Sequence, residues 1–511
     1  MRGIHNNIGD IRRKVFAAVA KMAYDGNYSR LRELPFDIIP GEDATYRDSI
    51  FVERAIVSER VRLACGLPLR SLDDYAPTDA GIEESAIAEK YYHPPLVNII
   101  KFACNACPEK RVIVTDMCQG CLAHPCVEVC PKKAVSMVKG HSHIDPEKCI
   151  KCGKCIEACD YNAIIKQERP CSKSCGMDAI SSDDHGRADI DYNKCVSCGM
   201  CMANCPFGAI ADKSQILQVC TAIRKGDKLT AIVAPAFVGQ FGPDLTPVRL
   251  PAAMHALGFQ SVKQVAVGAD LCTIDEANDF IEKVPGELPF MATSCCPAWS
   301  VMVKKLFPDL SDTISMALTP MVLTARMIKR KYPDHKICFV GPCAAKKLEA
   351  MRRSIRSDVD FVLTYEELAG MFDAKNVDFS KLESDESFGA GTTAAGRGFA
   401  VSGGVASAVV DLIKKDHPGV EINVVNAQGL RECKKMMALA KAGKYKGYLL
   451  EGMACPEGCV GGAGTIEAFN KAAVAVNRYK EESKKKLPTR RNMPALYICC
   501  WRMTANKAMM K

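Results

Sequence analysis

Cysteine spacing is the feature of this sequence that most restricts what it can fold into. Sixteen of its 28 cysteines lie between residues 104 and 205. Thiolates are soft ligands, so in a long chain such density indicates bound metal more than disulfides. No run of about 18 apolar residues could span a membrane, and charge interrupts the apolar residues of the first 26 positions, unlike a secretion signal. We therefore expect a protein of the reducing cytoplasm.

Two stretches have the C-x2-C-x2-C-x3-C spacing typical of bacterial ferredoxins. They run from Cys149 to Cys159 and from Cys195 to Cys205, which Pro206 follows. Three closely spaced thiolates hold one face of an iron–sulfur cube, and the fourth cysteine ligates the neighbouring cluster. Sixteen cysteines at this spacing predict a relay of three or four [4Fe–4S] clusters that moves single electrons.

The cross-over rule divides the sixteen cysteines into four sets. We predict a first set of Cys118, Cys121, Cys126 and Cys159, a second set of Cys130, Cys149, Cys152 and Cys155, a third set of Cys175, Cys195, Cys198 and Cys201, and a fourth set of Cys104, Cys107, Cys171 and Cys205. The fourth set follows by elimination only. A zinc site or an unliganded pair stays open for Cys104 and Cys107, because C-x2-C is also a zinc spacing.

The charge of the chain gives no reason to expect nucleic acid as a partner. The formal net charge of +9 counts cysteines as neutral, whereas metal-bound cysteines are thiolates. No basic patch is concentrated enough to bind a phosphate backbone. A basic surface could receive an acidic electron carrier, but a mixed, solvated surface is the simpler interpretation.

The sequence suggests three regions. Residues 1–95 have apolar positions at three- and four-residue spacing, which indicates helices. Residues 96–215 form the ferredoxin-like region. Residues 216–511 alternate apolar runs of strand length (LTAIVAPAF, PFMATS, KICFVG, INVVNA, YLLEGMA) with helical stretches, which favours an α/β domain with mostly parallel sheets. Ser311-Asp312 and Thr319-Pro320 can begin helices, and Gly258 and Gly370 can end them.

Three of the predicted strands end in turns that carry cysteines. The turns are TSCCPAW at residues 293–299, GPCAAKKLE at 341–349 and EGMACPEGCVGGAG at 451–464. Ligands gather outside the carboxyl ends of parallel strands, so these turns can converge on one buried site. The glycines after Cys459 would let the backbone approach a bulky cofactor.

These three motifs, in this order, closely resemble the signature loops of [FeFe]-hydrogenases, and the resemblance covers roughly residues 100–470. It implies reversible formation of H2 from protons and electrons. It also implies two mostly parallel sheets that flank an H-cluster, which is a [4Fe–4S] cube joined to a two-iron unit with CO, cyanide and azadithiolate ligands. A ferredoxin or similar electron carrier, and maturation proteins that supply the two-iron unit, are the implied partners.

The resemblance assigns roles residue by residue. Cys296, Cys343, Cys455 and Cys459 match the ligands of the cube, and Cys459 matches the bridge to the two-iron unit. Cys295 matches the proton-transfer thiol, and Lys346 matches a lysine that hydrogen-bonds cyanide. Met453 and Phe399 match residues packed around the diatomic ligands. Glu276, Asp279 and Ser315 fall where the family has its proton relay, although an acidic helix start and a hydroxyl near a turn are common in any protein.

Five positions depart from the family pattern. They are Ala236, Ala298, Met321, Gly341 and Ala463, all of which we expect near the two-iron unit. No departure removes a ligand, so they put in doubt the potential, direction and speed of catalysis. The sequence resembles a less common branch of the family.

Two other functions stay open. Eukaryotic relatives with similar loops act in iron–sulfur assembly and carry no two-iron unit, and a sensor of H2 or CO would turn over slowly. The remaining cysteines are expected to be buried apolar residues or packing contacts: Cys65, Cys220, Cys272, Cys338, Cys433 and the pair Cys499–Cys500. The run Lys484–Lys486 is expected to be solvated surface.

Overall fold

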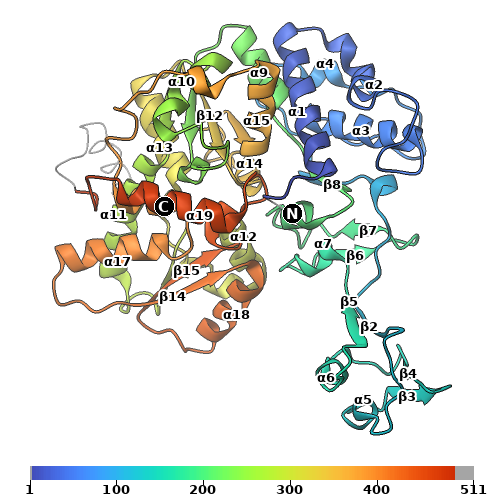
Figure 1. The fold of residues 1–511 in the computed structure, drawn as a ribbon. Helices are drawn as coiled ribbons and strands as arrows, with labels where there is room; N and C mark the ends of the chain where they lie inside the picture. The colour runs from blue at the N-terminus through green and yellow to red at the C-terminus, as the bar shows by residue number, and fades with distance from the viewer. Residues whose placement is uncertain (1–2, 490–511) are drawn as a thin grey trace.

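The computed structural model describes residues 3–489, which Figure 1 shows coloured along the chain. As predicted, the first 95 residues are helical. Their helices are α1 (Asn7–Asp25), α2 (Leu34–Ile38), α3 (Ile50–Ala64) and α4 (Ile82–Ser85). Helix α1 begins where the Asn6 side chain accepts a hydrogen bond from the Gly9 N–H, and it ends at Gly26, whose φ of 72° favours glycine.

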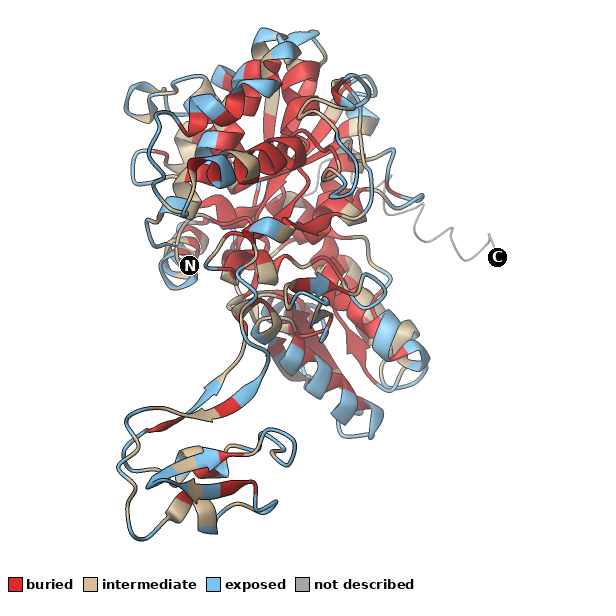
Figure 2. Cartoon of the chain, turned by 90° about the vertical axis from the view of Figure 1, so that its right-hand side faces the viewer, coloured by how far each residue is buried: buried red, intermediate tan, exposed pale blue. Residues whose placement is uncertain are grey.

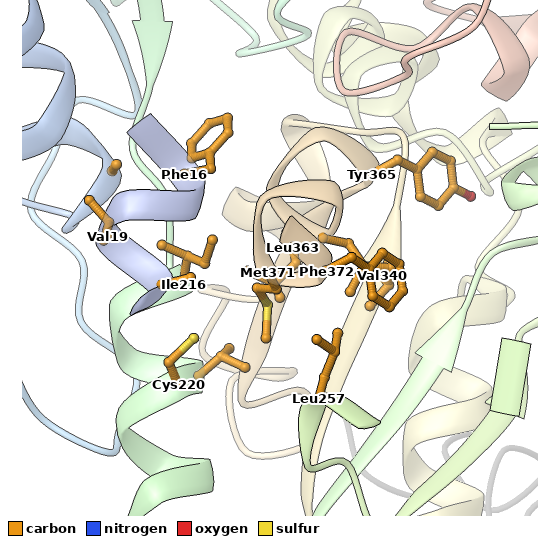
Figure 3. Close-up of a cluster of buried hydrophobic side chains, with 14 of the residues drawn as sticks. Phe16, Val19, Ile216, Cys220, Leu257, Val340, Leu363, Tyr365, Met371 and Phe372 are labelled. Atoms are coloured by element: carbon orange, nitrogen blue, oxygen red, sulfur yellow. The ribbon is translucent and has the colours of Figure 1, made fainter. Parts of the chain in front are cut away.

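The buried face of α1 belongs to the core of the C-terminal half. Phe16 and Val19 share a hydrophobic cluster with residues of α9 (Ile216–Arg224), β12 (Lys336–Gly341) and α15 (Tyr365–Ala374), as Figure 3 shows. A Cβ on Gly370 would lie 2.4 Å from the Phe16 Cβ. The prediction that Gly370 ends a helix is therefore wrong: the residue lies inside α15, where the close crossing with α1 leaves no room for a side chain.

The cysteine-rich region consists of two small units, one inserted into the other. The outer unit pairs β1 with β8 and β6 with β7, and the inner unit pairs β2 with β5 and β3 with β4, all antiparallel. Each unit has its own hydrophobic cluster. Its elements are β1 (Val97–Ile99), β2 (Arg111–Val114), α5 (Pro125–Glu128), β3 (Val135–Val138), β4 (His141–Ile144), α6 (Lys154–Glu157), β5 (Ile164–Gln167), α7 (Pro170–Lys173), β6 (Ile180–Ser182), β7 (Ala188–Ile190), α8 (Met200–Asn204) and β8 (Ile210–Asp212).

The chain leaves the outer unit after Cys107, builds the inner unit and returns before Cys171. Strands β2 and β5 are the neck of the inner unit, residues 110–167, which projects from the rest of the molecule in Figures 1 and 2. The sequence predicts one ferredoxin-like region here and does not reveal the nesting. The domain boundaries at residues 95 and 215 stay predictions.

Two fully parallel sheets form the C-terminal half, which confirms the predicted α/β architecture. One sheet has the order β10-β9-β12-β13 and the other has the order β11-β15-β14. The strands are β9 (Leu229–Val233), β10 (Ser261–Gln264), β11 (Met291–Ala292), β12, β13 (Phe361–Thr364), β14 (Asn423–Gln428) and β15 (Tyr448–Met453). Strands β9, β12 and β15 lie inside their sheets, so the turns that follow β12 and β15 are held by neighbours on both sides.

Helices surround both sheets. Besides α9 and α15 they are α10 (Leu250–Leu257), α11 (Ala266–Lys283), α12 (Pro297–Leu306), α13 (Pro320–Lys331), α14 (Ala345–Glu349), α16 (Ala394–Gly398), α17 (Gly404–Asp416), α18 (Leu430–Lys441) and α19 (Phe469–Glu481). Helix α13 begins after Thr319 and α10 ends at Gly258, as predicted. Ser311 instead lies within a 3-10 turn, residues 308–313, so it begins no helix. None of the helices in residues 3–489 has both the length and the apolar character needed to cross a bilayer.

Candidate functional site

A cavity lies where the carboxyl ends of the two sheets meet, and the empty space there is about 850 Å³ when the open solvent at its mouth is included. The turns after β9, β11, β12 and β15 form its wall together with parts of α11 and α13. Its lining includes Ala236, Cys295, Cys296, Ala298, Met321, Phe339, Cys343, Lys346, Phe399, Met453, Cys455 and Cys459. This is the position that parallel-sheet topology favours for a ligand. The structure thus brings together residues from all three cysteine-bearing turns.

The four cysteines predicted to hold the cube all line this cavity. Cys296 precedes α12, and the N–H groups of Ala298, Trp299 and Ala454 hydrogen-bond to its sulfur. Burial, with a smaller contribution from neighbouring cysteines, raises the pKa of the Cys343 thiol to about 11 and that of Cys459 to about 12. Four closely placed, part-buried thiols with raised pKa values would become thiolates more readily beside a strongly positive centre, such as a bound metal cluster.

The donor set fits an iron–sulfur centre with anionic ligands. Within residues 3–489 no group of three or more His, Cys, Asp or Glu side chains is placed to hold a single metal ion. The four thiols instead surround a volume suited to a centre of several irons. The Lys346 ammonium lies 2.6 Å from Glu349, yet its Nζ has no well-aligned hydrogen bond. A buried ammonium with unused N–H groups in the wall is a good donor for a small anion.

Glu349 fixes the position of Lys346 and was not predicted from the sequence. Its carboxylate is 1% exposed and accepts a hydrogen bond of 2.7 Å from the Thr319 hydroxyl. Although burial lowers the pKa of Lys346, Glu349 and the nearby thiols raise it more, so the net shift is upward. Lys346 therefore stays charged inside the protein.

Cys295 lies next to a buried carboxylate. The Glu276 Oε1 atom accepts hydrogen bonds from the Ser294 N–H (3.0 Å) and the Ser294 hydroxyl (3.2 Å), and the Ser315 hydroxyl also faces this carboxylate. Burial, with a smaller contribution from the nearby Glu451, raises the pKa of Glu276 to about 7. The negative charge of Glu276 in turn raises the pKa of the Cys295 thiol, which burial has already raised. The structure thus brings three predicted relay residues together.

Asp279 lies one turn further along α11 and points elsewhere. Its carboxylate forms an ion pair of 2.8 Å with Lys283, four residues later on the same helix. No hydrogen bond joins Asp279 to Glu276 or Ser315 among the described residues. Asp275, which was not predicted, has a pKa raised to about 6 by burial and by Asp279.

Three of the departures from the family pattern, Ala236, Ala298 and Met321, line the cavity as expected. At Gly341 a Cβ would lie 2.5 Å from the Phe339 ring, so this ring occupies the space of the missing side chain. Ala463 does not face the cavity. It packs against Gly199 of the third set's loop, whose Cβ would lie 2.6 Å from the Ala463 Cβ.

The glycines after Cys459 let the chain fold closely on itself. Gly462 also lines the cavity, and the expected approach to a cofactor stays a prediction. A Cβ on Gly461 would lie 2.0 Å from the Pro456 carbonyl oxygen, and one on Gly462 would lie 2.5 Å from the Pro342 carbonyl oxygen. These glycines admit close approach of the protein's own backbone. The turn after β15 can therefore fold tightly against the turn after β12.

The third and fourth sets of cysteines lie beside the cavity and beside each other. Cys198 lines the cavity and interacts electrostatically with Cys343. Cys175 and Cys195 are neighbours of Cys198 and Cys201, and Cys201 is also close to Cys171 of the fourth set. Within the fourth set, Cys104 and Cys205 are electrostatic neighbours of both Cys107 and Cys171. The third set, predicted by the cross-over rule, and the fourth set, predicted by elimination, therefore each lie close together in space.

The first and second sets lie in the inner unit. Cys155 is close to Cys130, Cys149 and Cys152, which together make the second set. Two members of the first set approach Ser142: its N–H donates to the Cys118 sulfur at 3.4 Å, and its hydroxyl lies 3.1 Å from the Cys126 sulfur. The ligand assignments themselves stay predictions.

The cysteines without a predicted ligand role are buried. Cys65, Cys220, Cys272, Cys338 and Cys433 are each 0% exposed, which confirms the expectation of apolar packing. Lys484, Lys485 and Lys486 are exposed, as expected. The pair Cys499–Cys500 lies outside the described residues.

Comparison with known proteins agrees with this geometry. A family model described as "Iron only hydrogenase large subunit, C-terminal domain" matches residues 227–463, and two models described as "4Fe-4S dicluster domain" match residues 110–160 and 148–209. The periplasmic [Fe] hydrogenase large subunit of Nitratidesulfovibrio vulgaris is 31% identical over 63% of this chain and 85% of its own length. The chain belongs to the iron-only hydrogenase family.

The other proteins similar to this chain include hydrogenases and an iron–sulfur assembly component. Iron hydrogenase 1 of Clostridium pasteurianum is 32% identical over 63% of this chain, which spans 64% of that protein's length. Cytosolic iron-sulfur assembly component 3 of Bos taurus is 25% identical over 45% of this chain and 59% of its own length. A solved structure of the [FeFe]-hydrogenase HydA1 from Chlamydomonas reinhardtii aligns with a TM-score of 0.43 at 22% identity, over 54% of this chain and 90% of that one.

Proposed function

We propose that this chain is an [FeFe]-hydrogenase that interconverts protons and electrons with H2. One cavity that is lined by four part-buried cysteines together with Cys295 and Lys346 is the observation that carries the proposal. Cys296, Cys343, Cys455 and Cys459 would hold the cube of an H-cluster, and Cys459 would also bridge to its two-iron unit. When bound, that cluster supplies the iron centre at which protons and electrons combine.

The remaining wall residues would orient the cluster and keep water out. Lys346, fixed by Glu349, would donate hydrogen bonds to a cyanide ligand. Met453 and Phe399 are 2% and 6% exposed and would cover the diatomic ligands with apolar surface. A water-poor cavity strengthens each of these electrostatic contacts.

Protons would pass between the surface and the cavity through Ser315, Glu276 and Cys295. Because the pKa of Glu276 is about 7, this carboxyl can both accept and donate a proton at neutral pH. Cys295 would exchange the proton with the cluster. Asp279 would act only at the outer end of this route, since Lys283 holds its carboxylate near the surface.

Electrons would reach the cavity through the four sets of cysteines. The third set would deliver them, since Cys198 lines the cavity, and the fourth set would supply the third. The projecting inner unit would receive electrons from a ferredoxin or similar carrier at the first and second sets. Maturation proteins would supply the two-iron unit, and a cytoplasmic location stays a prediction.

A role in iron–sulfur assembly is the second candidate function, favoured by the similarity to the Bos taurus assembly component. A sensor with slow turnover is the third, favoured by the altered wall at Ala236, Met321 and Gly341. Both differ from a hydrogenase in measurable ways: an assembly protein has no CO or cyanide ligands, and a sensor has the ligands but little turnover.

The deciding experiment combines infrared spectroscopy with an H2 assay after a synthetic two-iron unit is supplied. CO and cyanide bands with H2 production support the hydrogenase proposal, and intact clusters without bands or turnover refute it. Cys295→Ala should keep the bands and lose turnover. The matched control is Cys220→Ala, which removes a buried thiol of α9 that does not line the cavity and should keep both the bands and turnover.

A further inference from the structure

The N-terminal helical region contacts the backbone turns that carry two cysteines of the fourth set. The Arg47 guanidinium donates hydrogen bonds of 3.0 Å to the Ala103 carbonyl, just before Cys104, and of 3.0 Å to the Phe207 carbonyl, two residues after Cys205. The Arg60 guanidinium donates to the Gly208 carbonyl, whose own N–H bonds back to the Cys205 carbonyl. Arg47 therefore joins turns that are about a hundred residues apart in sequence, and Arg60 holds the second of these turns.

Both arginines are held in place before any cluster binds. Glu53 of α3 is 0% exposed, and its Oε1 atom accepts the backbone N–H groups of Thr45, Tyr46 and Arg47 at 2.5–2.8 Å. This fixes the loop that carries Arg47. Arg60 lies on α3 itself and is 6% exposed.

The positive charges of these two side chains are not neutralised by acidic partners. Within residues 3–489 neither Arg47 nor Arg60 forms an ion pair with a carboxylate; their hydrogen-bond acceptors are carbonyl oxygens. The Cys205 sulfur is an electrostatic neighbour of Arg60. A third arginine, Arg169 of the outer unit, lies near Cys107 and Cys171. A buried guanidinium without a counter-charge is costly unless a bound anion compensates it.

We propose that Arg47 and Arg60 position the cysteine turns of the fourth set and raise the reduction potential of its cluster. A [4Fe–4S] cube with four thiolate ligands is an anion, and reduction adds one more negative charge. Fixed positive charge beside it stabilises the reduced form, because charge and hydrogen bonding around a cluster set its potential. Residues 1–95 would thus act on the electron relay although they supply no ligand. The inference rests on the proposed assignment of a cluster to the fourth set.

The test is a redox titration of the purified, cluster-loaded full chain. Electron paramagnetic resonance spectra are recorded at each potential, and iron content is measured on each sample. We expect Arg60→Met to make reduction of one accessory cluster at least tenfold less favourable, a shift of about 59 mV to more negative potential for one electron. Arg47→Met should act on the same signal. Arg60→Lys keeps the charge, so the potential should stay close to that of the unmodified protein even if the shorter side chain holds the turn less firmly.

Arg62→Met is the matched control. Arg62 lies on the same helix and is 4% exposed, and its guanidinium likewise donates to carbonyls, those of Pro68, Thr78 and Ala80 at 2.8–3.0 Å. Its loss should lower stability without moving any accessory potential. If Arg62→Met shifts the same signal as Arg60→Met, or if neither Arg60→Met nor Arg47→Met shifts one, the inference is wrong.

Two further measurements separate failure of this inference from failure of the cluster assignment. Cys107→Ala in the otherwise native chain should remove one cluster signal and about four irons per chain. If iron content and spectra are unchanged, the fourth set holds no cluster, and both the assignment and the inference fail. If the cluster is lost in Cys107→Ala but its potential is indifferent to Arg47 and Arg60, only the inference fails. Neither the iron content nor the reduction potential depends on H2 turnover.

Discussion

Replacement of Lys347 by methionine should destabilise the protein more than any single surface change. The Lys347 ammonium is buried between two carboxylates, Asp212 and Glu367, each at 2.7 Å, and it also donates to the Lys213 carbonyl at 2.9 Å. Asp212 ends β8 of the outer unit, and Glu367 lies in α15. The ion cluster therefore joins the ferredoxin-like region to the sheet that carries Cys343.

The magnitude follows from burial. Lys347, Asp212 and Glu367 are 4%, 7% and 1% exposed. Removing one partner of a buried ion pair leaves an uncompensated charge, which typically costs ~3–5 kcal/mol. Total stability of a domain is of the order of ~5–15 kcal/mol. Burial lowers the pKa of Lys347, but the two carboxylates raise it more, so the folded protein keeps the charge. This stabilisation should be constant at neutral pH and decline only as the lysine loses its proton above about pH 10.4.

Urea unfolding followed by far-UV circular dichroism measures the change. The control is Lys228→Met, which breaks an ion pair with Asp334 in which both side chains are more than half exposed; its expected cost is ~0–1 kcal/mol. Neutralising both acids, with Asp212→Asn and Glu367→Gln added to Lys347→Met, should recover part of the loss. Equal stability of Lys347→Met and Lys228→Met would refute the reasoning.

Three further predictions concern the site and the relay. Glu276→Gln should keep the infrared bands but slow H2 production by ~10²–10⁴-fold, the usual range for a lost acid–base group. In the unmodified protein, H2 evolution should fall as pH rises through about 7, because Glu276 then loses its proton, and Glu276→Gln should lack this inflection. Replacing residues 110–167 by a short linker should remove two clusters' worth of iron and abolish reduction by ferredoxin, while turnover with a small-molecule reductant remains. Loss of turnover with both donors would contradict an electron-entry role for the inner unit.

The sequence predicts the C-terminal sheets well where strands are apolar and end in distinctive turns. Strands β12 and β15 follow this pattern, and their cysteines mark the cavity correctly. Strands β10 and β13 escape prediction because SVKQ and FVLT are only four residues long and follow no recognisable motif. The role of Gly370 could not be predicted either, since only the packing of α1 on α15 shows why a glycine is needed within a helix.

Some residues of the candidate site can likewise be predicted from the sequence, and others cannot. The resemblance of three turns to the family's signature loops identifies Cys295, Cys296, Cys343, Cys455 and Cys459, and ferredoxin-like spacing identifies Cys198. Glu349, Arg47 and Arg60 leave no such signal, since each acts on a turn distant in sequence. The nesting of the inner unit leaves no clear signal either. The run from Cys149 to Cys159 in the inner unit has the same spacing as the run from Cys195 to Cys205 in the outer unit, so only strand pairing reveals which turns belong together.

The nesting of one unit inside the other also dictates an order of events during synthesis. The inner unit holds all eight cysteines of its two sets within residues 110–167, so it can fold and acquire iron as soon as it leaves the ribosome. Cys104 and Cys107 emerge earlier but must wait for Cys171 and Cys205 before the fourth set is complete. Helix α1 can bury its apolar face only after α15 has been made, which is later still. Helix α1 is thus made before the inner unit but buried after it, and the unit that can load iron first is the one that projects from the rest of the molecule (Figure 1).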